Sequence, residues 1–400
     1  MKKFVNPIII YVILWCVYTL QGFLYPSGSI ISRLLVLIII LWSLISMYRV
    51  NTQSKKCPSF FKALNIFVLM ATFYGVMLIL SNQELYVTEG MYIKTSNYEY
   101  LKNIYISLLP FYVFYDYSAR GKLTVRHILI MTLVLLSVTI VTFLYDRAMA
   151  ILSAAQLGII RDGFTLNVGY TFLSLMPLLI FWDRMKFWQF MILIVILFFI
   201  VLCMKRGAIL VGAVCFMYFL YSSVRSSSGS RKTLVVILSI LALVATSLVV
   251  YHLFNNNDYF AQRVQQTLEG NSSNRDELYS IYYNHFMSER NFFRFFFGNG
   301  ANSTLSIGYN YAHNDWLEIA INNGVLGLVI YLCYFFSLFK DYVRAKSRNV
   351  VSARVIMMAI IIMFSTSLFS MSYAAMNIGL SMPLGLALAH VYNQHSETYR

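Results

Sequence analysis

The stretch WQFMILIVILFFIVLCMKRGAILVGAVCFMYFLYS, residues 188–222, decides the fold class. Its two apolar runs, at 188–204 and 207–222, each approach the length of about 20 residues that a helix needs to cross a bilayer. Lys205 and Arg206 stand between the runs with almost no loop. The stretch therefore predicts two membrane helices joined by a tight, positively charged turn.

The composition of the whole chain agrees with this reading. Of its 400 residues, 59% are apolar and 12% are charged, whereas soluble domains average about 25% charged residues. One or two soluble cores could not bury so much apolar surface. Disorder, a secreted disulfide scaffold and a cytosolic enzyme are excluded, and an all-α polytopic membrane protein is expected. The five cysteines show no CxxC spacing, so they indicate neither a metal site nor a disulfide framework.

Apolar runs long enough to span a membrane recur along the chain and predict about 12 transmembrane helices. Nine fall in residues 1–254 and three in 313–400, and a long hydrophilic segment, 255–312, separates the two groups. The predicted spans are 7–25, 30–48, 62–80, 100–117, 124–145, 167–182, 188–204, 207–222, 233–254, 315–339, 350–370 and 372–392.

The distribution of charge predicts the orientation, because lysine and arginine favour cytoplasmic loops. With the N-terminus inside, alternation places 20 of the 31 lysines and arginines on the inside, but only 4 of the 16 acids. The net charge of +15 is thereby explained without nucleic acid as a partner. We expect a multi-pass protein of the cytoplasmic membrane with both termini in the cytoplasm.

The segment 255–312 is rich in tyrosine and phenylalanine and is expected to fold onto the membrane surface. Asn274, followed three residues later by Glu277, has the pattern of a capping box, and apolar residues then recur at helical spacing. The pattern predicts an interfacial helix with Arg275 in its first turn, where the helix dipole favours anions. Arg275 is either an anion ligand or a solvated surface residue.

Lys205 and Arg206 fall on the outside, where positive charge is otherwise sparse. One interpretation is an anion-binding group in which Arg206 grips a phosphate through two parallel hydrogen bonds. The other is a pair of cations whose side chains extend from a helix end towards water.

His313 and Asn314 precede a predicted span at its outside end. Histidine takes up a proton near neutral pH, so His313 is a candidate base, although a structural interfacial histidine fits the spacing as well. Asp315 with Glu318 has the pattern of an N-cap and an acid at the third helical position. Gly324 and Gly327 are interpreted as small residues that let two membrane helices pack closely.

These residues resemble a known signature. His313-Asn314, nine further residues and Gly324-Val325-Leu326-Gly327 are similar to the His-Asn-x9-Gly-x-x-Gly pattern of the O-antigen ligase and O-antigen polymerase superfamily. Gly298-Asn299-Gly300, which alone reads as a loop, is similar to the Gly-x-Gly that precedes the histidine in these proteins.

Two further matches fall in the same order along the chain, and together the resemblance covers about residues 200–335. Lys205-Arg206-Gly207 is similar to a Ser-Arg-Gly segment between two spans, with Lys205 in place of the usual serine or threonine. Arg275 is similar to the arginine that opens the helix of the periplasmic loop.

The resemblance implies a bacterial inner-membrane enzyme with one large periplasmic loop and a fold related to the C-type membrane glycosyltransferases. Such enzymes transfer glycan from undecaprenyl pyrophosphate without a nucleotide sugar, a metal or another cofactor. The implied partners are carrier-linked glycan donor and acceptor, membrane lipid, a chain-length regulator and a flippase.

Residue chemistry assigns roles within this scheme. Arg206 and Arg275 would bind the pyrophosphate leaving group, which needs fixed cations, and Lys205, Arg263, Arg290 and Arg294 are held in reserve. His313 would deprotonate the acceptor hydroxyl, and Asn314 would orient the histidine or the substrate.

We expect a polymerase of carrier-linked repeat units. A ligase that transfers finished O-antigen to lipid A-core is the nearest alternative. A flippase or transporter is a third possibility, although polar groups gathered at one face fit it less well.

Overall fold

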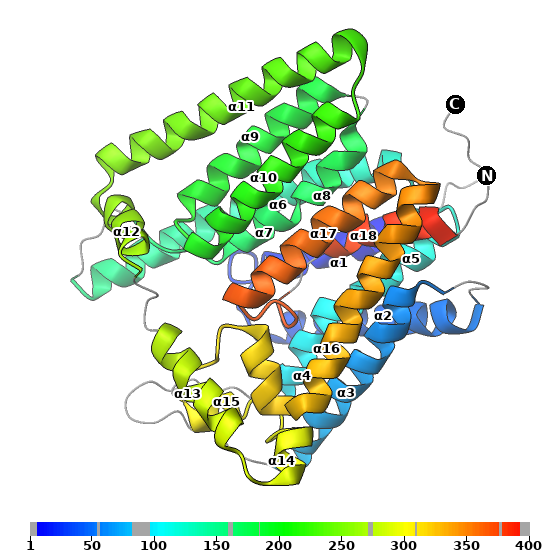
Figure 1. Ribbon diagram of the computed structural model, residues 1–400, viewed down its shortest axis with the longest axis vertical. Helices are drawn as coiled ribbons and strands as arrows, with labels where there is room; N and C mark the ends of the chain where they lie inside the picture. Colours follow the sequence, from blue (N-terminus) through cyan, green and yellow to red (C-terminus); the bar gives the residue numbers. More distant parts are fainter. Residues whose placement is uncertain are drawn as a thin grey trace.

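The computed structural model describes residues 6–53, 57–81, 97–158, 163–183, 185–270, 275–308, 310–375 and 378–392. Every regular element within these ranges is a helix (Figure 1). The expected all-α fold of a polytopic membrane protein is confirmed. Some residues used in the sequence argument lie outside the described residues, namely Lys2, Lys3, Lys55, Lys56, Arg184, Asn274, Glu397 and Arg400.

Seven helices in the described part of the chain are long and apolar enough to cross a membrane, and each coincides with a predicted span. They are α2 (Ile30–Gln53), α3 (Ser59–Ser81), α6 (Val125–Gln156), α10 (Arg206–Arg225), α11 (Gly229–Asn256), α16 (Asp315–Arg348) and α17 (Val350–Phe369).

The other five predicted spans are shorter or divided. Four coincide with short apolar helices, namely α1 (Pro7–Thr19), the succession α7 (Val168–Ser174), α8 (Met176–Leu179) and η1 (Ile180–Trp182), then α9 (Lys186–Leu202) and α18 (Ile378–Tyr392). The fifth is split into α4 (Asn97–Leu108) and α5 (Pro110–Ala119). Pro110 occupies the first position of α5, where the missing N–H of proline is tolerated.

The core is centred on α18, whose described residues are almost all buried. α5 packs along it. A Cβ at Gly385 would lie 2.7 Å from the Cβ of Phe114 and 2.8 Å from the backbone nitrogen of Tyr115. Only glycine therefore allows the two helices to approach this closely.

Carboxylates anchor one end of the bundle, which we call the inner end. Asp116 pairs with Arg49 and Arg120. Asp183 pairs with Lys186 at 2.6 Å and with Arg354 at 3.3 Å, and Asp341 accepts from the backbone nitrogens that open α3 and from Tyr392.

Each of these contacts joins segments that the predicted alternation of spans places on the inside. The structure therefore agrees with the alternation. Which end faces the cytoplasm stays a prediction from charge.

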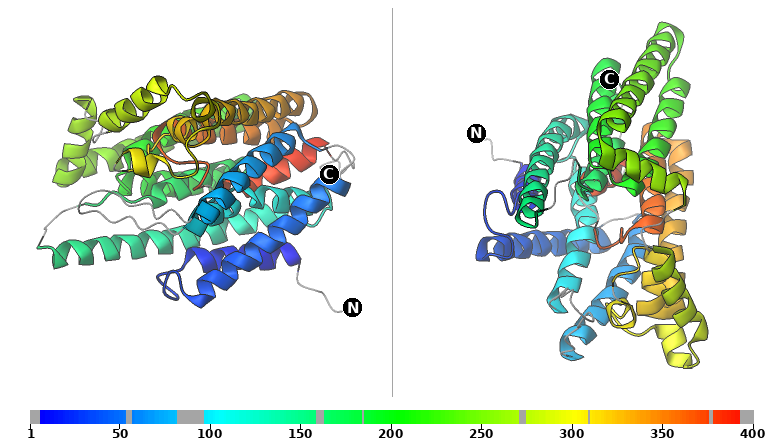
Figure 2. Two further views of the ribbon diagram at one scale, coloured as in Figure 1. Left: turned by 90° about the horizontal axis from the view of Figure 1, so that it is seen from below. Right: turned by 90° about the vertical axis from the view of Figure 1, so that its left-hand side faces the viewer.

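The segment 255–312 lies at the opposite, outer end and contains more structure than the one helix expected. Its helices are α12 (Asp258–Leu268), α13 (Arg275–Ser288), α14 (Phe292–Phe297) and α15 (Thr304–Ile307). α13, α14 and α15 cluster together, in yellow-green to yellow (Figures 1 and 2). The side chains of Asn257 and Asn291 cap α12 and α14 by accepting backbone N–H bonds.

α16 is not one straight helix. Gly324 has φ +66° and ψ −162°, a conformation open almost only to glycine. Asp315 and Tyr331 would lie about 24 Å apart in a straight helix, yet the Tyr331 hydroxyl donates to Asp315 over 2.6 Å. The chain therefore reverses at Gly324, and residues 315–323 lie back along the part of the helix that follows.

This reversal corrects the interpretation of the two glycines as contact points between membrane helices. A Cβ at Gly324 would lie 2.6 Å from the backbone of Phe296 and Gly298, and one at Gly298 would lie 2.4 Å from the backbone of Asn322. A Cβ at Gly327 would lie 2.9 Å from the side chain of Ile319. Gly298 and Gly324 thus allow the reversal to pack against the turn after α14, and Gly327 allows the two arms of α16 to pack against each other.

Candidate functional site

The C-terminal end of α17 is the point at which the candidate residues meet. The last carbonyls of a helix have no partners within the helix and carry its negative dipole end. The Phe369 oxygen accepts a hydrogen bond from Arg275 over 2.9 Å. The Leu368 oxygen accepts from Tyr279 and from Asn314, each over 3.3 Å. Residues distant in sequence are thereby fixed to one helix end.

Arg206 lies beside the same helix end. It is the first residue of α10, and its guanidinium donates to the Thr267 hydroxyl of α12 over 3.3 Å. A Cβ on the adjacent Gly207 would be 3.5 Å from the Cβ of Phe369 and 2.4 Å from the Tyr170 hydroxyl. Glycine therefore lets α10 start against the end of α17.

The site carries a concentration of positive charge. Burial lowers the pKa of Lys205, and the nearby charges of Arg275 and Arg263 lower it further. Lys205 is the N-cap residue of α10, and Arg263 lies in α12. Two of the additional candidate cations, Lys205 and Arg263, therefore lie at the site. A third, Arg294, lies in α14, which packs on α16.

His313 is half-buried beside these cations. Its backbone has φ +50°, an uncommon conformation for a residue with a side chain. Its carbonyl lies 3.3 Å from the Tyr279 hydroxyl, which shares its one proton between this oxygen and that of Leu368. Burial lowers the pKa of His313, and the charges of Arg275 and Lys205 lower it further. The lowered pKa favours the uncharged imidazole, which is the form that can accept a proton.

Asn314 caps α16, a position that the sequence pattern had assigned to Asp315. The Asn314 side-chain oxygen accepts from the backbone nitrogens of Trp316 and Leu317 over 2.9 and 3.2 Å. The prediction of Asp315 as N-cap is wrong, because asparagine, one residue earlier, already satisfies these donors. The side chain of Asn314 thus links the start of α16 to the end of α17.

Asp315 and Glu318 are fully buried and hold the surrounding loops in place. Asp315 accepts from the Ser372 backbone nitrogen over 2.8 Å and from the Ser372 hydroxyl, as well as from Tyr331. Glu318 accepts from the Thr304 hydroxyl over 2.5 Å and from the Ala312 nitrogen over 2.9 Å. Sequence reasoning treated both as capping residues. Their position within an apolar helix was the available signal for buried, hydrogen-bonded acids.

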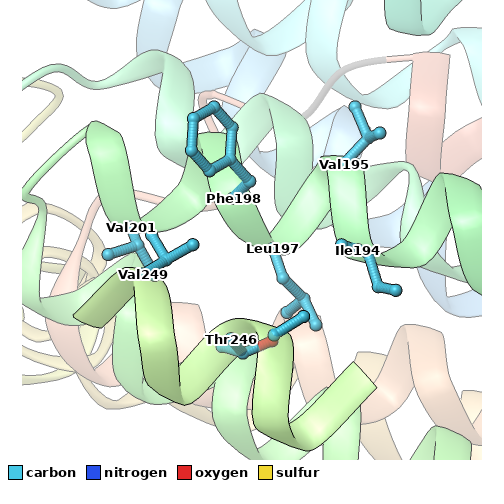
Figure 3. A pocket seen from close by; sticks show the side chains of 8 residues that line it. Ile194, Val195, Leu197, Phe198, Val201, Thr246 and Val249 are labelled. Carbon is cyan, nitrogen blue, oxygen red and sulfur yellow. The ribbon is translucent and has the colours of Figure 1, made fainter. Parts of the chain in front are cut away.

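An apolar cavity of about 150 Å³ lies between α9 and α11. α9, α10 and α11 pack against one another, and the cavity is lined by aliphatic residues with Phe198 and Thr246 (Figure 3). Val201, at one end of the lining, is four residues before Lys205. The lining thus includes a residue near the end of α9 that precedes the cations at the start of α10.

No group of three or more histidine, cysteine or acidic side chains in the described residues is arranged to hold a metal ion. The polar chemistry of the site is that of cations, an uncharged imidazole and amide or hydroxyl groups. Such a set suits an anionic ligand next to a group that loses a proton.

Comparison with protein families agrees with this chemistry. Residues 190–332 match the family described as O-antigen ligase. The match supports a relationship between this part of the chain and the O-antigen polymerase and ligase superfamily. The matched range contains all five predicted site residues, Lys205, Arg206, Arg275, His313 and Asn314, and the glycines at the reversal of α16. A comparison with curated proteins gave no match.

The match supports a function of the O-antigen polymerase or ligase type in a bacterial membrane. Members are membrane glycosyltransferase-like enzymes of polysaccharide biosynthesis. The match does not distinguish polymerase from ligase.

Proposed function

We propose that the protein polymerises oligosaccharide repeat units linked to undecaprenyl pyrophosphate, at the periplasmic face of the bacterial inner membrane. It would transfer the growing chain from one carrier to the non-reducing end of a new carrier-linked unit. The observation that carries the proposal is the meeting of Arg206, Arg275 and an uncharged His313 around the end of α17.

The cations suit the leaving group. Undecaprenyl pyrophosphate departs with several negative charges, and fixed cations in a partly dehydrated site stabilise such charge strongly. Arg206 and Arg275 lie on two elements, α10 and α13, so they could hold the pyrophosphate from two sides. Lys205 and Arg263 add charge to the same place.

His313 suits the attacking group. A sugar hydroxyl is a weak nucleophile until a base removes its proton. In the proposed step the hydroxyl proton passes to the His313 imidazole, and the hydroxyl oxygen forms the new bond to the anomeric carbon. The bond from that carbon to the pyrophosphate oxygen breaks with its electron pair. Asn314 and Tyr279 would hold His313 in place, because both bond to the end of α17.

The cavity between α9 and α11 suits the carrier lipid. Its lining is almost entirely apolar, and it lies between two apolar helices, α9 and α11. An isoprenoid tail there would leave its pyrophosphate near Lys205 and Arg206, at the adjoining helix end.

A reconstitution tests the proposal directly. Purified protein is incubated with synthetic undecaprenyl-pyrophosphate repeat units, and a ladder of products is expected. His313→Ala should lower the rate by about 10²–10⁴-fold if the imidazole is the base, while the variant remains folded in the membrane. Normal chain lengths from that variant would remove the catalytic role of His313.

A ligase remains the second candidate, because the matched family is described as O-antigen ligase. Deletion of the gene separates the two functions. Loss of a polymerase leaves lipopolysaccharide with a single repeat unit, whereas loss of a ligase leaves none. Flux of carrier-linked glycan across vesicles without bond formation would favour a transporter instead.

A further inference from the structure

A second cavity, of about 210 Å³, lies next to the site on the outer end of the bundle. Four segments line it: α4, the turn between α14 and α15, the loop before α16 and the loop between α17 and α18. The lining residues are Glu99, Tyr100, Asn103, Asn302, Tyr311, Met371, Tyr373, Ala374 and Ala375. Tyr311 is two residues before His313, and Met371 is two residues after Phe369. Two residues span at most about 7 Å, so its wall adjoins both His313 and the helix end that binds Arg275.

The lining combines flat rings with short polar groups. Tyr100, Tyr311 and Tyr373 come from three separate segments of the chain. Glu99, Asn103 and Asn302 add a carboxylate, which only accepts hydrogen bonds, and two amides, which both donate and accept. A sugar presents C–H faces that pack on rings and hydroxyls that both donate and accept, so the cavity matches a sugar in both respects.

Charge distinguishes this cavity from the cation site. Glu99 is the only charged residue among the described residues that line it, and it forms a partly exposed ion pair with Lys102 at 3.8 Å. The cation site instead gathers Lys205, Arg206 and Arg275. A carboxylate repels pyrophosphate, so the phosphate end of a substrate is directed to the cations and an uncharged or amino sugar to the cavity.

The walls of the cavity are held by buried acids. Glu318 fixes the loop before α16 through Thr304 and Ala312. Asp315 fixes the loop after α17 by accepting from the backbone nitrogens of Ser372 and Tyr373. A cavity whose walls are fixed in this way requires little ordering when a ligand binds.

We propose that this cavity is the subsite for the acceptor saccharide, which would place the terminal sugar of the incoming repeat unit beside His313. The assignment rests on the proposed function. Pockets for drug-sized ligands have volumes of about 300–1,000 Å³. The smaller volume of this cavity suits one sugar residue rather than a whole repeat unit.

Binding of a carrier-free glycan tests the subsite without requiring catalysis. The probe is the reducing oligosaccharide repeat unit, released from the surface glycan of the cells that make the protein. Its affinity for full-length protein in lipid nanodiscs is measured by calorimetry. Glu99→Gln and Asn103→Ala should each weaken binding by about tenfold, because the first replaces one charged acceptor by a donor and the second removes the amide group. Asn284→Ala, an exposed position on α13, is the matched control and should bind as the wild type does.

A second probe separates the two sites. Geranylgeranyl pyrophosphate should lose binding in Arg275→Gln and keep it in Glu99→Gln, whereas the oligosaccharide should show the reverse. Two results would overturn the subsite. One is that the wild-type protein fails to bind the oligosaccharide, and the other is that the Glu99→Gln and Asn103→Ala variants bind it normally.

Thermal unfolding of each variant shows whether a loss of binding reflects a loss of folding. A wild-type protein that binds the oligosaccharide with this variant pattern, yet makes no ladder, would refute the polymerase and leave the saccharide subsite standing.

Discussion

At the scale of single residues, the electrostatics of His313 decide what it can do. A free histidine has a pKa of about 6.5. Burial and the nearby charges of Arg275 and Lys205 disfavour the imidazolium ion and lower the pKa of His313. The sequence could not decide this balance, because Asp315 and Glu318 lie within five residues and could have favoured the cation. In the structure both carboxylates are occupied by other hydrogen bonds.

The lowered pKa predicts a pH profile. Because the uncharged imidazole is the active form, the acid limb of the rate profile should have its midpoint below pH 6.5. In Arg275→Gln the loss of a nearby cation should raise the pKa of His313. NMR titration of the histidine, assigned by comparison with His313→Asn, measures both values. A pKa that stays unchanged in Arg275→Gln would contradict the proximity of the two groups.

Arg206 provides a second residue-scale prediction. Lysine keeps the charge but cannot form two parallel hydrogen bonds to a phosphate. Arg206→Lys should therefore lower kcat/KM by about tenfold or more, the usual worth of one hydrogen bond to a charged group. Arg225→Lys, at the exposed inner end of the same helix, is the control. Full activity of Arg206→Lys would show that charge alone suffices there.

At the scale of elements, the reversal of α16 is the feature that positions the site. The hairpin brings Asp315 and Trp316 alongside Tyr331, with the rings of Trp316 and Tyr331 5.0 Å apart. His313 thus lies at the level of the end of α17 rather than at the outermost point of the chain. The hydrophobic pattern of residues 315–339 could not reveal this, because apolar residues continue across the break.

Gly324→Ala tests the reversal. The backbone conformation alone costs about 1–3 kcal/mol for a residue with a Cβ, and the new Cβ would also lie 2.6 Å from the backbone near Gly298. We expect a lower unfolding temperature and loss of polymer.

Gly121→Ala is the matched control, because its φ is +69° but nothing lies within 4 Å of the added Cβ. Equal effects of the two substitutions would show that the contact with Gly298 contributes nothing.

At the scale of the whole molecule, the sequence predicted where the apolar helical segments lie, and seven of them in the described part of the chain are long enough to cross a membrane. Long apolar runs and the positions of cations carry that information directly. The sequence could not reveal that the site residues bind to the carbonyl groups of Leu368 and Phe369, because carbonyl groups at a helix end have no signature in the sequence. It also missed α12, whose polar residues resemble a loop, and the division of the fourth predicted span at Pro110.

Cysteine labelling tests the orientation of the bundle. In a variant that lacks the five native cysteines, Ser306→Cys should react with a membrane-impermeant maleimide in spheroplasts, because Ser306 is exposed at the outer end. Lys122→Cys, exposed at the inner end, should react only after the membrane is permeabilised. The opposite pattern would invert the assigned orientation.

One short segment, 368–375, adjoins both the cations and the proposed saccharide cavity. This arrangement has a consequence for chain growth. On the proposed reaction, each turnover leaves the lengthened glycan on the carrier that arrived as acceptor. Before the next turnover, that carrier must bring its own pyrophosphate to the cations, while the spent carrier leaves. Each cycle of elongation would then include an exchange of carrier lipids between the two sites. The growing chain could be released from the enzyme at this exchange, once in every cycle.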